Sequence, residues 1–201
     1  MKIYDISQEL FACEVYPGDP APEREVLSSV AAGDVCNLTA LRMCAHNGTH
    51  VDAPYHFLSE GKTVDVLPLS HFIGPCYVAE HQGALTAAHA AAILRNAAQG
   101  HGEAVRRILI KGDATVTADA AKVFAEAHIL LLGNESQTVG PEDAPMEVHL
   151  ILLSAEVVLL EGIRLHHVPE GAYVLNCAPI NLGGADGAPC RAVLTDMTAP
   201  W

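Results

Sequence analysis

The order of apolar and polar residues changes character near Thr86. Before that point the chain carries short apolar alternations, at Ile3 to Ile6 and at Leu38 to Met43, separated by turn-rich stretches such as YPGDPAP. This pattern predicts short strands and loops that lean towards antiparallel pairing. After Thr86, segments with helical apolar spacing alternate with short continuous apolar runs. Because strands buried on both faces read as unbroken apolar runs, this part predicts α/β units around a parallel sheet.

Three helix–strand units are predicted between Thr86 and Glu161. The segments TAAHAAAILRNAA and TADAAKVFAEA each begin at a threonine suited to cap a helix, and the strands RRILIKG and HILLLGN follow them. The third unit is a helix from Pro145 through Ser154, followed by the strand VVLLEG. The pattern of the tail from Ala172 predicts two strands joined by a glycine-rich loop. We therefore expect an α/β fold with a mixed sheet, as a single domain over residues 1–201.

Composition limits the classes of partner. The chain has a formal net charge of −13 with only 11 Lys and Arg, so its surface repels nucleic acid and anionic lipid. No apolar run is long enough to span a bilayer, and the N-terminus does not read as a signal peptide. The 6 cysteines show no C-x-x-C pairing and are expected as reduced thiols. We expect a cytoplasmic protein that acts on a small molecule, without nucleic acid or membrane partners, and that forms a homodimer or homotetramer.

The stretch CAHNGTHVDAPYHF crowds ligand-type side chains around a glycine and a proline. In an extended strand His46 and His50 would lie about 13 Å apart, too far to share one ion easily. A helix through these residues is disfavoured, because the proline would end it early. We therefore predict a tight bend at Asn47 and Gly48, after which His50 and Asp52 point to the same side of an extended stretch. The bend would bring His46 back onto the same ion.

Two imidazoles and one carboxylate leave the shell of a divalent ion incomplete. Glu161 follows four aliphatic residues at the carboxyl end of a predicted buried strand, where a carboxylate is costly unless it is paired or metal-bound. His149 lies on the preceding predicted helix; if it stood alone, it would read as an ordinary core histidine. We predict that these two residues supply the missing ligands.

The stretch HNGTHVDAPYH resembles the H-x-G-T-H-x-D-x-P-x-H signature of the bacterial kynurenine formamidase-like, or cyclase, family of metal-dependent hydrolases, which includes isatin hydrolase. The segments YDIS, YPGD, HLILLSAEVVLLEG and GGADGAPCRAVL also occur in the family's order. The resemblance implies a swivelling β/β/α-type fold and two divalent ions. By position, it implies that His46, His50 and Asp52 hold one ion. Asp52 and Glu161 would touch both ions, with His149 on the second.

The resemblance also implies that His56 is the catalytic acid/base. Two carboxylate-bridged ions lower the pKa of a shared water, and the resulting hydroxide would attack a small amide, formamide or lactam. His56 would then protonate the leaving amine, because imidazole exchanges protons near neutral pH. Zinc is the first expectation for the metal and manganese the next, since imidazole and carboxylate ligands suit both. Lactone hydrolysis or cyclisation at the same centre, or a metal-binding module that has lost catalysis, are the alternatives.

The chain departs from the family where substrate would bind. The family's formamidases carry a tryptophan before PGD that stacks on the aryl substrate, whereas Tyr16 stands there in this chain. In the loop LGNESQTVGPED, Asn134 replaces the usual acid. Ser136 and Gln137 are expected either to face the pocket or, as is more common for loop residues, to be solvated. We therefore expect Tyr16 to contact a substrate other than N-formylkynurenine. Arg191 is expected to form a structural ion pair.

Overall fold

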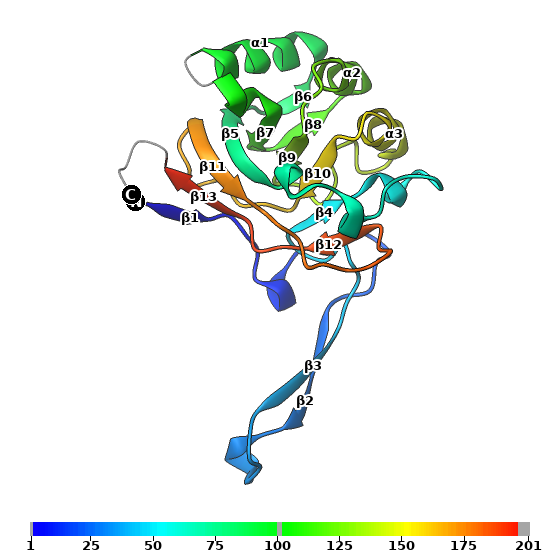
Figure 1. Cartoon of the computed structure of the whole chain (residues 1–201), viewed down its shortest axis with the longest axis vertical. Coiled ribbons are helices and arrows are strands. Elements are labelled where there is room, and N and C mark those ends of the chain that lie inside the picture. The colour runs from blue at the N-terminus through cyan, green and yellow to red at the C-terminus, as the bar shows by residue number, and fades with distance from the viewer. Residues whose placement is uncertain (1, 100–101, 197–201) are drawn as a thin grey trace.

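A nine-stranded mixed sheet forms the centre of the computed structural model, which describes residues 2–99 and 102–196 (Figure 1). The strands lie in the order β1-β13-β11-β5-β7-β9-β10-β4-β12. Their bounds are β1 Ile3–Asp5, β4 His50–Asp52, β5 Ile73–Glu80, β7 Arg107–Lys111, β9 Leu131–Asn134, β10 Val158–Glu161, β11 Gly171–Asn176, β12 Gly187–Pro189 and β13 Val193–Asp196. The predicted α/β fold with a mixed sheet is confirmed.

The middle of the sheet is parallel and carries the helices. Strands β5, β7, β9 and β10 pair in parallel in that order. Helices α1 (Ala87–Ala98), α2 (Ala118–Glu126) and α3 (Met146–Ser154) lie together on one side of these strands (Figure 1). Thr86 and Thr117 cap the first two helices as predicted, Thr86 within a capping box that His89 completes. The predicted alternation of helices and strands is therefore confirmed.

Two apolar clusters fill the two sides of the sheet. Strand residues such as Ile108 and Leu132 pack with helix residues such as Phe124 in one cluster. Their strand neighbours, such as Leu109 and Leu131, belong to the other. This alternation follows from the period of two along a strand, and it explains why these strands read as continuous apolar runs. A two-sided core of this kind supports the neighbouring strands β10 and β4.

The tail differs from the prediction of two strands. It contains three, because residues Gly187–Pro189 within the glycine-rich loop form β12. This strand pairs antiparallel with β4, not with the other tail strands. Its pairing partner lies far away in the sequence, so no local alternation of apolar and polar residues predicts β12. The tail therefore also contributes to the region around His50 and Asp52.

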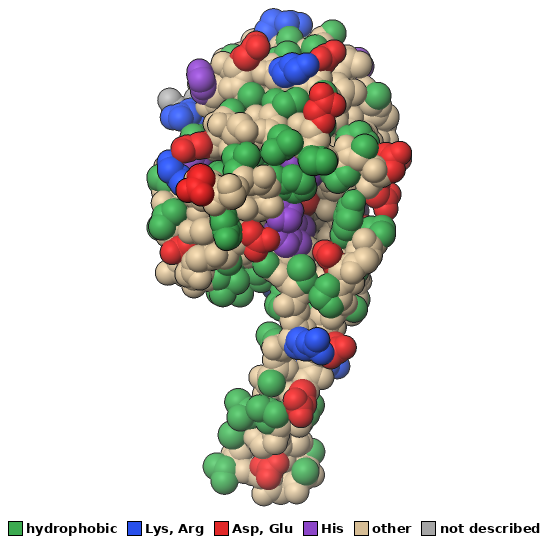
Figure 2. All heavy atoms as spheres, turned by 90° about the vertical axis from the view of Figure 1, so that its right-hand side faces the viewer, with side chains coloured by type: hydrophobic (Ala, Val, Ile, Leu, Met, Phe, Trp, Pro, Cys, Tyr) green, Lys and Arg blue, Asp and Glu red, His purple; other side chains and the backbone are tan. Residues whose placement is uncertain are grey.

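A hairpin arm projects away from the body of the molecule (Figures 1 and 2). It consists of β2 (Glu23–Ser28) and β3 (Leu38–Arg42), which pair antiparallel as a separate sheet. Its large apolar side chains are more than half exposed: Val26, Leu27, Val30, Val35, Leu38 and Leu41. A second small sheet, of β6 (Gly83–Leu85) and β8 (Ala114–Val116), lies near the helices. Isolated two-stranded hairpins are marginally stable, which makes the exposed apolar arm a notable feature.

No helix within residues 2–99 and 102–196 combines the length and the apolar character needed to cross a membrane. The prediction of a single domain over 1–201 stays a prediction, because it includes positions outside the described residues.

Candidate metal centre and active site

The predicted bend is present before β4. Gly48 has a φ of +67°, in the left-handed region that glycine adopts without strain. The Asn47 side chain stabilises the turn, because its Oδ1 accepts a hydrogen bond from the Cys44 backbone at 2.8 Å. After the bend, His50 and Asp52 lie on β4 and are each only 1% exposed. The two side chains share one side of the strand, as predicted.

Glu161 reaches the same place from the neighbouring strand. Strand β10 pairs antiparallel with β4, and Glu161 lies directly opposite His50. Its Oε1 accepts a hydrogen bond from the Val139 backbone at 2.7 Å, and the carboxylate is buried. The predicted end-of-strand position therefore places this carboxylate against the β4 histidine.

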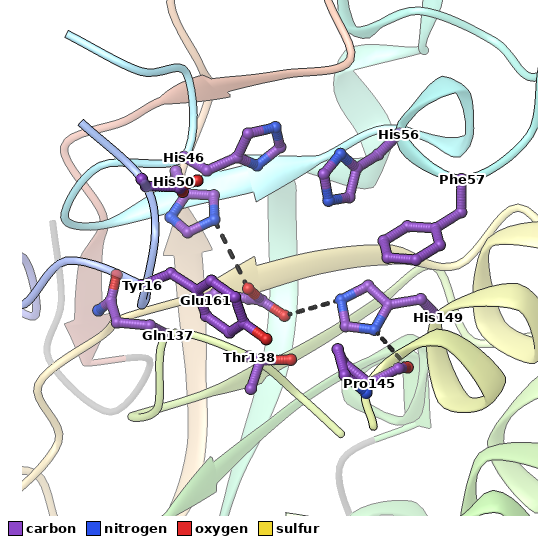
Figure 3. Close-up of a pocket in the computed structure, with 11 residues that line it drawn as sticks. Tyr16, His46, His50, His56, Phe57, Gln137, Thr138, Pro145, His149 and Glu161 are labelled. Carbon is purple, nitrogen blue, oxygen red and sulfur yellow. Dashed lines mark hydrogen bonds and ion pairs between the residues drawn. The ribbon is translucent and has the colours of Figure 1, made fainter. Parts of the chain in front are cut away.

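His50 and His149 present the same nitrogen to the carboxylates. The Nδ1 of His50 donates to the Gly48 carbonyl at 3.0 Å, and the Nδ1 of His149 donates to the Pro145 carbonyl at 2.9 Å. Each Nε2 therefore faces Glu161, at 3.5 Å from His50 and 3.4 Å from His149 (Figure 3). Backbone acceptors on the second ring nitrogen fix the tautomer in the way that metal-binding histidines require.

A cation fits this donor set. If both Nε2 atoms carried lone pairs, each lone pair would be repelled by the carboxylate oxygens that it faces. A proton or a metal ion between the nitrogen and the oxygens removes this repulsion. Burial alone would lower the pKa of His50, but the Asp52 and Glu161 carboxylates outweigh it and raise that pKa to about 10. The same opposition raises the pKa of His149 to about 10. Within the described residues, the buried Asp52 Oδ2 accepts no hydrogen bond. In the metal-free protein, protonation of His50 and His149 therefore offsets the charge of the carboxylates, and a divalent ion bound there would replace those protons.

Two potential ligand groups share Asp52. One is His46, His50 and Asp52, and the other is Asp52, His149 and Glu161. Within each group the candidate ligand atoms all lie within 4.8 Å of one another. The structure thus brings all five predicted ligands together. Asp52 belongs to both groups, as the resemblance implies, whereas Glu161 belongs to the second group only. Their role as metal ligands stays a prediction.

Asp186 lies beside the predicted centre, although it is not among the predicted site residues. Its Oδ2 lies 2.8 Å from His46 Nε2 and 3.2 Å from His56 Nδ1. A third ligand-type group, His46, His56 and Asp186, follows from these contacts. The available signal was an acid in the GGADGAP loop, but nothing local indicates that β12 places this loop beside β4. The structure therefore adds one carboxylate at the edge of the predicted centre.

The centre lies in a pocket of about 290 Å³. Figure 2 shows histidine side chains in a hollow of the body, above the base of the arm. The lining includes both predicted non-ligand residues, His56 and Tyr16. His56 is 28% exposed, and the Tyr16 hydroxyl donates to the Glu142 carbonyl at 2.8 Å. The remaining lining residues are Asp19, His46, His50, Phe57, Gln137, Thr138, Pro145, His149 and Glu161.

The loop after β9 contributes Gln137 to the pocket. Of the two alternatives left open for this residue, facing the pocket is the one observed: its amide nitrogen and oxygen are buried, and neither has a hydrogen-bond partner among the described residues. Gly162 leaves room for it, because a methyl group there would collide with the Gln137 amide. Ser136 is exposed, as expected. Asn134 is buried and donates to the Thr138 carbonyl at 2.9 Å, so it shapes the loop without lining the pocket.

Other side chains match their structural interpretations. Arg191 forms an ion pair with Asp5 at the surface, as predicted. All six cysteines are free thiols. Burial raises the pKa of Cys44, the cysteine beside the histidine-rich stretch, which disfavours the reactive thiolate.

Buried histidines and carboxylates in a pocket beside β4 and β10 of a mixed α/β sheet define a candidate hydrolytic metal centre. The family described as "Putative cyclase" matches residues 4–141. The chain is 36% identical to a kynurenine formamidase of Salinibacter ruber over 100% of both chains. It is 32% identical to a kynurenine formamidase of Bacillus anthracis, over 96% of this chain and 97% of that relative. The chain belongs to this cyclase family.

Solved structures agree with this membership. A potential metal-dependent hydrolase with cyclase activity is 27% identical, with a TM-score of 0.80 over 96% of each chain. An isatin hydrolase bound to the product analogue thioisatinate has a TM-score of 0.80 over 96% of this chain and 91% of its own. Its identity of 20% shows a shared fold alone. The family and the enzyme class predicted from the sequence, a metal-dependent hydrolase, are confirmed.

Proposed function

We propose that the chain hydrolyses the C–N bond of a small amide, formamide or lactam with the help of bound divalent ions. The observation that carries this proposal is the pair of ligand groups that share Asp52 in a pocket large enough for a small molecule. The kynurenine formamidase relatives support the choice of C–N bonds.

The ligands would be His46, His50, Asp52, His149 and Glu161, which could hold up to two ions, with zinc first and manganese next. Divalent ions bound there supply a Lewis acid for a carbonyl oxygen and lower the pKa of water. The protein contributes fixed ligand orientation, because His50 and His149 are each anchored through Nδ1 to a backbone carbonyl.

His56 would move the proton. Its Nδ1 faces Asp186 at 3.2 Å, which leaves Nε2 as the nitrogen available to a substrate. The ring is held in place by a tilted contact with His46, with ring centroids 4.1 Å apart, and by the edge contact with Phe57 at 4.7 Å. A leaving amine needs a proton as the C–N bond breaks, and a positioned imidazole can deliver it. Tyr16 offers an aromatic surface to the substrate from the same pocket.

The experiment is a hydrolysis screen of purified protein loaded with zinc or manganese. The probes are N-formylkynurenine, isatin and simple lactones, each also tested with metal-free protein and with His56→Ala. Metal-dependent cleavage of an amide or lactam that His56→Ala lacks would support the proposal. Cleavage of lactones alone would favour the lactone-hydrolase alternative, and stable metal binding without any turnover would favour a binding module.

We also propose that the chain forms a homodimer or homotetramer through the hairpin arm. The support is the cluster of exposed apolar side chains on β2 and β3, which a second copy of the chain could bury. Light scattering coupled to size exclusion should give the mass of a dimer or tetramer. Replacing Val26 and Leu41 by lysine should shift it towards the monomer, whereas a monomeric wild-type protein would contradict the proposal.

We further propose that the protein is located in the cytoplasm. It is supported by six free cysteines, which suit a reducing compartment. Fractionation with an antibody against the chain would test it, and recovery from a secreted fraction would contradict it.

A further inference from the structure

We infer that Asp186 is a positioning residue that orients the metal-ligand candidate His46 and the acid/base candidate His56 through one carboxylate oxygen. The roles of His46 as a ligand and His56 as the acid/base rest on the proposed function. The contacts do not depend on it: Asp186 Oδ2 lies 2.8 Å from His46 Nε2 and 3.2 Å from His56 Nδ1.

The contacts assign a tautomer to each ring. When His46 uses Nδ1, 2.8 Å from Asp52 Oδ1, on the metal side, its Nε2 carries the hydrogen and donates it to Asp186. His56 donates through Nδ1 to the same oxygen. A carboxylate oxygen has two lone pairs and can accept both hydrogen bonds. When His56 is neutral, its Nε2 therefore presents a lone pair to the pocket. When His56 is cationic, the same nitrogen bears the proton that can be transferred.

The backbone holds Asp186 in this position. Its carbonyl accepts a hydrogen bond from Ala53 at 2.8 Å, and the next residue, Gly187, is paired with Asp52 across β12 and β4. A side chain at Gly187 would crowd the His46 ring, with a Cβ 2.7 Å from Cε1. Asp65 Oδ1 fixes the loop further back by accepting from Gly184 at 3.0 Å. The backbone around Asp186 is thus joined to β4 and to Ala53 by contacts that do not involve the Asp186 side chain.

These features distinguish positioning from a surface ion pair. The Asp186 side chain is 41% exposed, yet its two partners are more buried, with His46 at 13% and His56 at 28%. Both partners line the pocket. A carboxylate behind a metal-binding histidine commonly changes metal affinity or activity by about 10–100-fold when it is replaced. Here the same oxygen also restrains the acid/base ring, so its removal should affect the rate even while the metals stay bound.

The test compares Asp186→Asn with the control Asp65→Asn, which removes a loop carboxylate near Gly184 but keeps an acceptor there. The first readout is the ¹⁵N chemical shift pair of the His56 ring, which reports the tautomer and needs neither a substrate nor a metal. Asp186→Asn should convert a predominantly Nδ1–H tautomer into a mixture, whereas Asp65→Asn should not. An unchanged His56 tautomer in Asp186→Asn would overturn the inference, whatever the fate of the proposed activity.

The second readout is metal content and steady-state kinetics with whichever of N-formylkynurenine, isatin or a simple lactone the wild type cleaves. Asp186→Asn should retain the wild-type zinc stoichiometry and lose about 10–100-fold in kcat, with KM changed much less. Asp186→Glu, which restores the carboxylate, should recover part of the rate. If Asp186→Asn loses one ion per chain at saturating zinc, Asp186 is a metal ligand and the inference is overturned. If Asp65→Asn loses as much rate as Asp186→Asn, the rate loss comes from a distorted loop and the inference is overturned as well.

Discussion

His50 and Glu161 lie directly opposite each other across the antiparallel pair of β4 and β10, with His50 Nε2 3.5 Å from Glu161 Oε2. The two residues are 111 positions apart, and the register of the two strands alone decides that they meet. A shift of the register by one residue would turn Glu161 to the opposite face of the sheet. The candidate metal centre is therefore a consequence of strand pairing as much as of the histidine-rich motif.

The first prediction concerns metal content. Protein prepared without chelator should contain up to two divalent ions per chain, and Asp52→Ala or Glu161→Ala should lose at least one. The reason is that each carboxylate faces more than one histidine of the ligand groups. Elemental analysis measures the stoichiometry. Wild-type protein without transition metal, even after reconstitution, would contradict the metal centre itself.

The second prediction concerns pH. In the metal-free protein the pKa values of His50 and His149 are both raised from 6.5 to about 10, despite burial, by Asp52 and Glu161. Their charged forms stabilise the metal-free fold fully below pH 6.5, and this contribution is lost as the pH rises through about 10. A metal ion needs both imidazoles neutral, so binding must release protons and must strengthen as the pH rises across that window.

Calorimetric titration of the metal-free protein with zinc, in buffers of different ionisation enthalpy, counts the protons released. We expect more than one proton per chain at neutral pH. Proton release close to zero, or an affinity that does not change with pH between 7 and about 9, would show that His50 and His149 are not displaced from protons by the metal.

The third prediction separates binding from catalysis. His56→Ala should keep the metals and the fold but lose about 10²–10⁴-fold in kcat, the usual share of general acid–base catalysis. Metal content and rate must be measured on the same preparations, alongside Asp52→Ala as a comparison that loses metal. If His56→Ala loses metal as readily, then His56 is a ligand and the group of His46, His56 and Asp186 holds an ion.

The fourth prediction concerns the aromatic wall of the pocket. N-formylkynurenine should be a weak substrate of the wild type, and Tyr16→Trp should raise its kcat/KM by about 2–10-fold, as expected for about 0.5–1.5 kcal/mol of added aromatic contact. Tyr16→Phe is the control, because it removes only the hydroxyl that donates to Glu142. A wild-type kcat/KM of about 10⁴ M⁻¹s⁻¹ or more on N-formylkynurenine would contradict the interpretation of this position.

Local patterns were sufficient for the central fold. The capping threonines Thr86 and Thr117 and the unbroken apolar strands before Asn134 and Glu161 each carry a signal within about a dozen residues. Strand β12 could not be predicted in this way, because three residues of a glycine-rich loop become a strand only by pairing with β4. Nor does any local pattern set the order of nine strands in the sheet.

The same distinction applies to the site. The bend at Gly48 and the shared side of His50 and Asp52 follow from glycine conformations and strand alternation, so the motif alone predicted them. Asp186 was missed because its importance comes from β12 lying beside β4. The sequence left open whether Gln137 faces the pocket or the solvent, because the room that Gly162 leaves for its amide comes from a different strand end. Such contacts depend on how segments that are distant in the sequence pack together, and residue type and spacing do not reveal that packing.

The two groups that share Asp52 differ in how much of the chain must be organised before they exist. His46, His50 and Asp52 span seven positions, and a single tight bend brings them together. Asp52, His149 and Glu161 meet only after α3 has packed and β10 has paired with β4 across a loop of about a hundred residues. Closing a long loop costs more entropy and takes longer than closing a short one. If both groups bind metal as proposed, the first would therefore be able to take up an ion in a nascent or partly unfolded chain, whereas occupancy of the second would require the completed sheet.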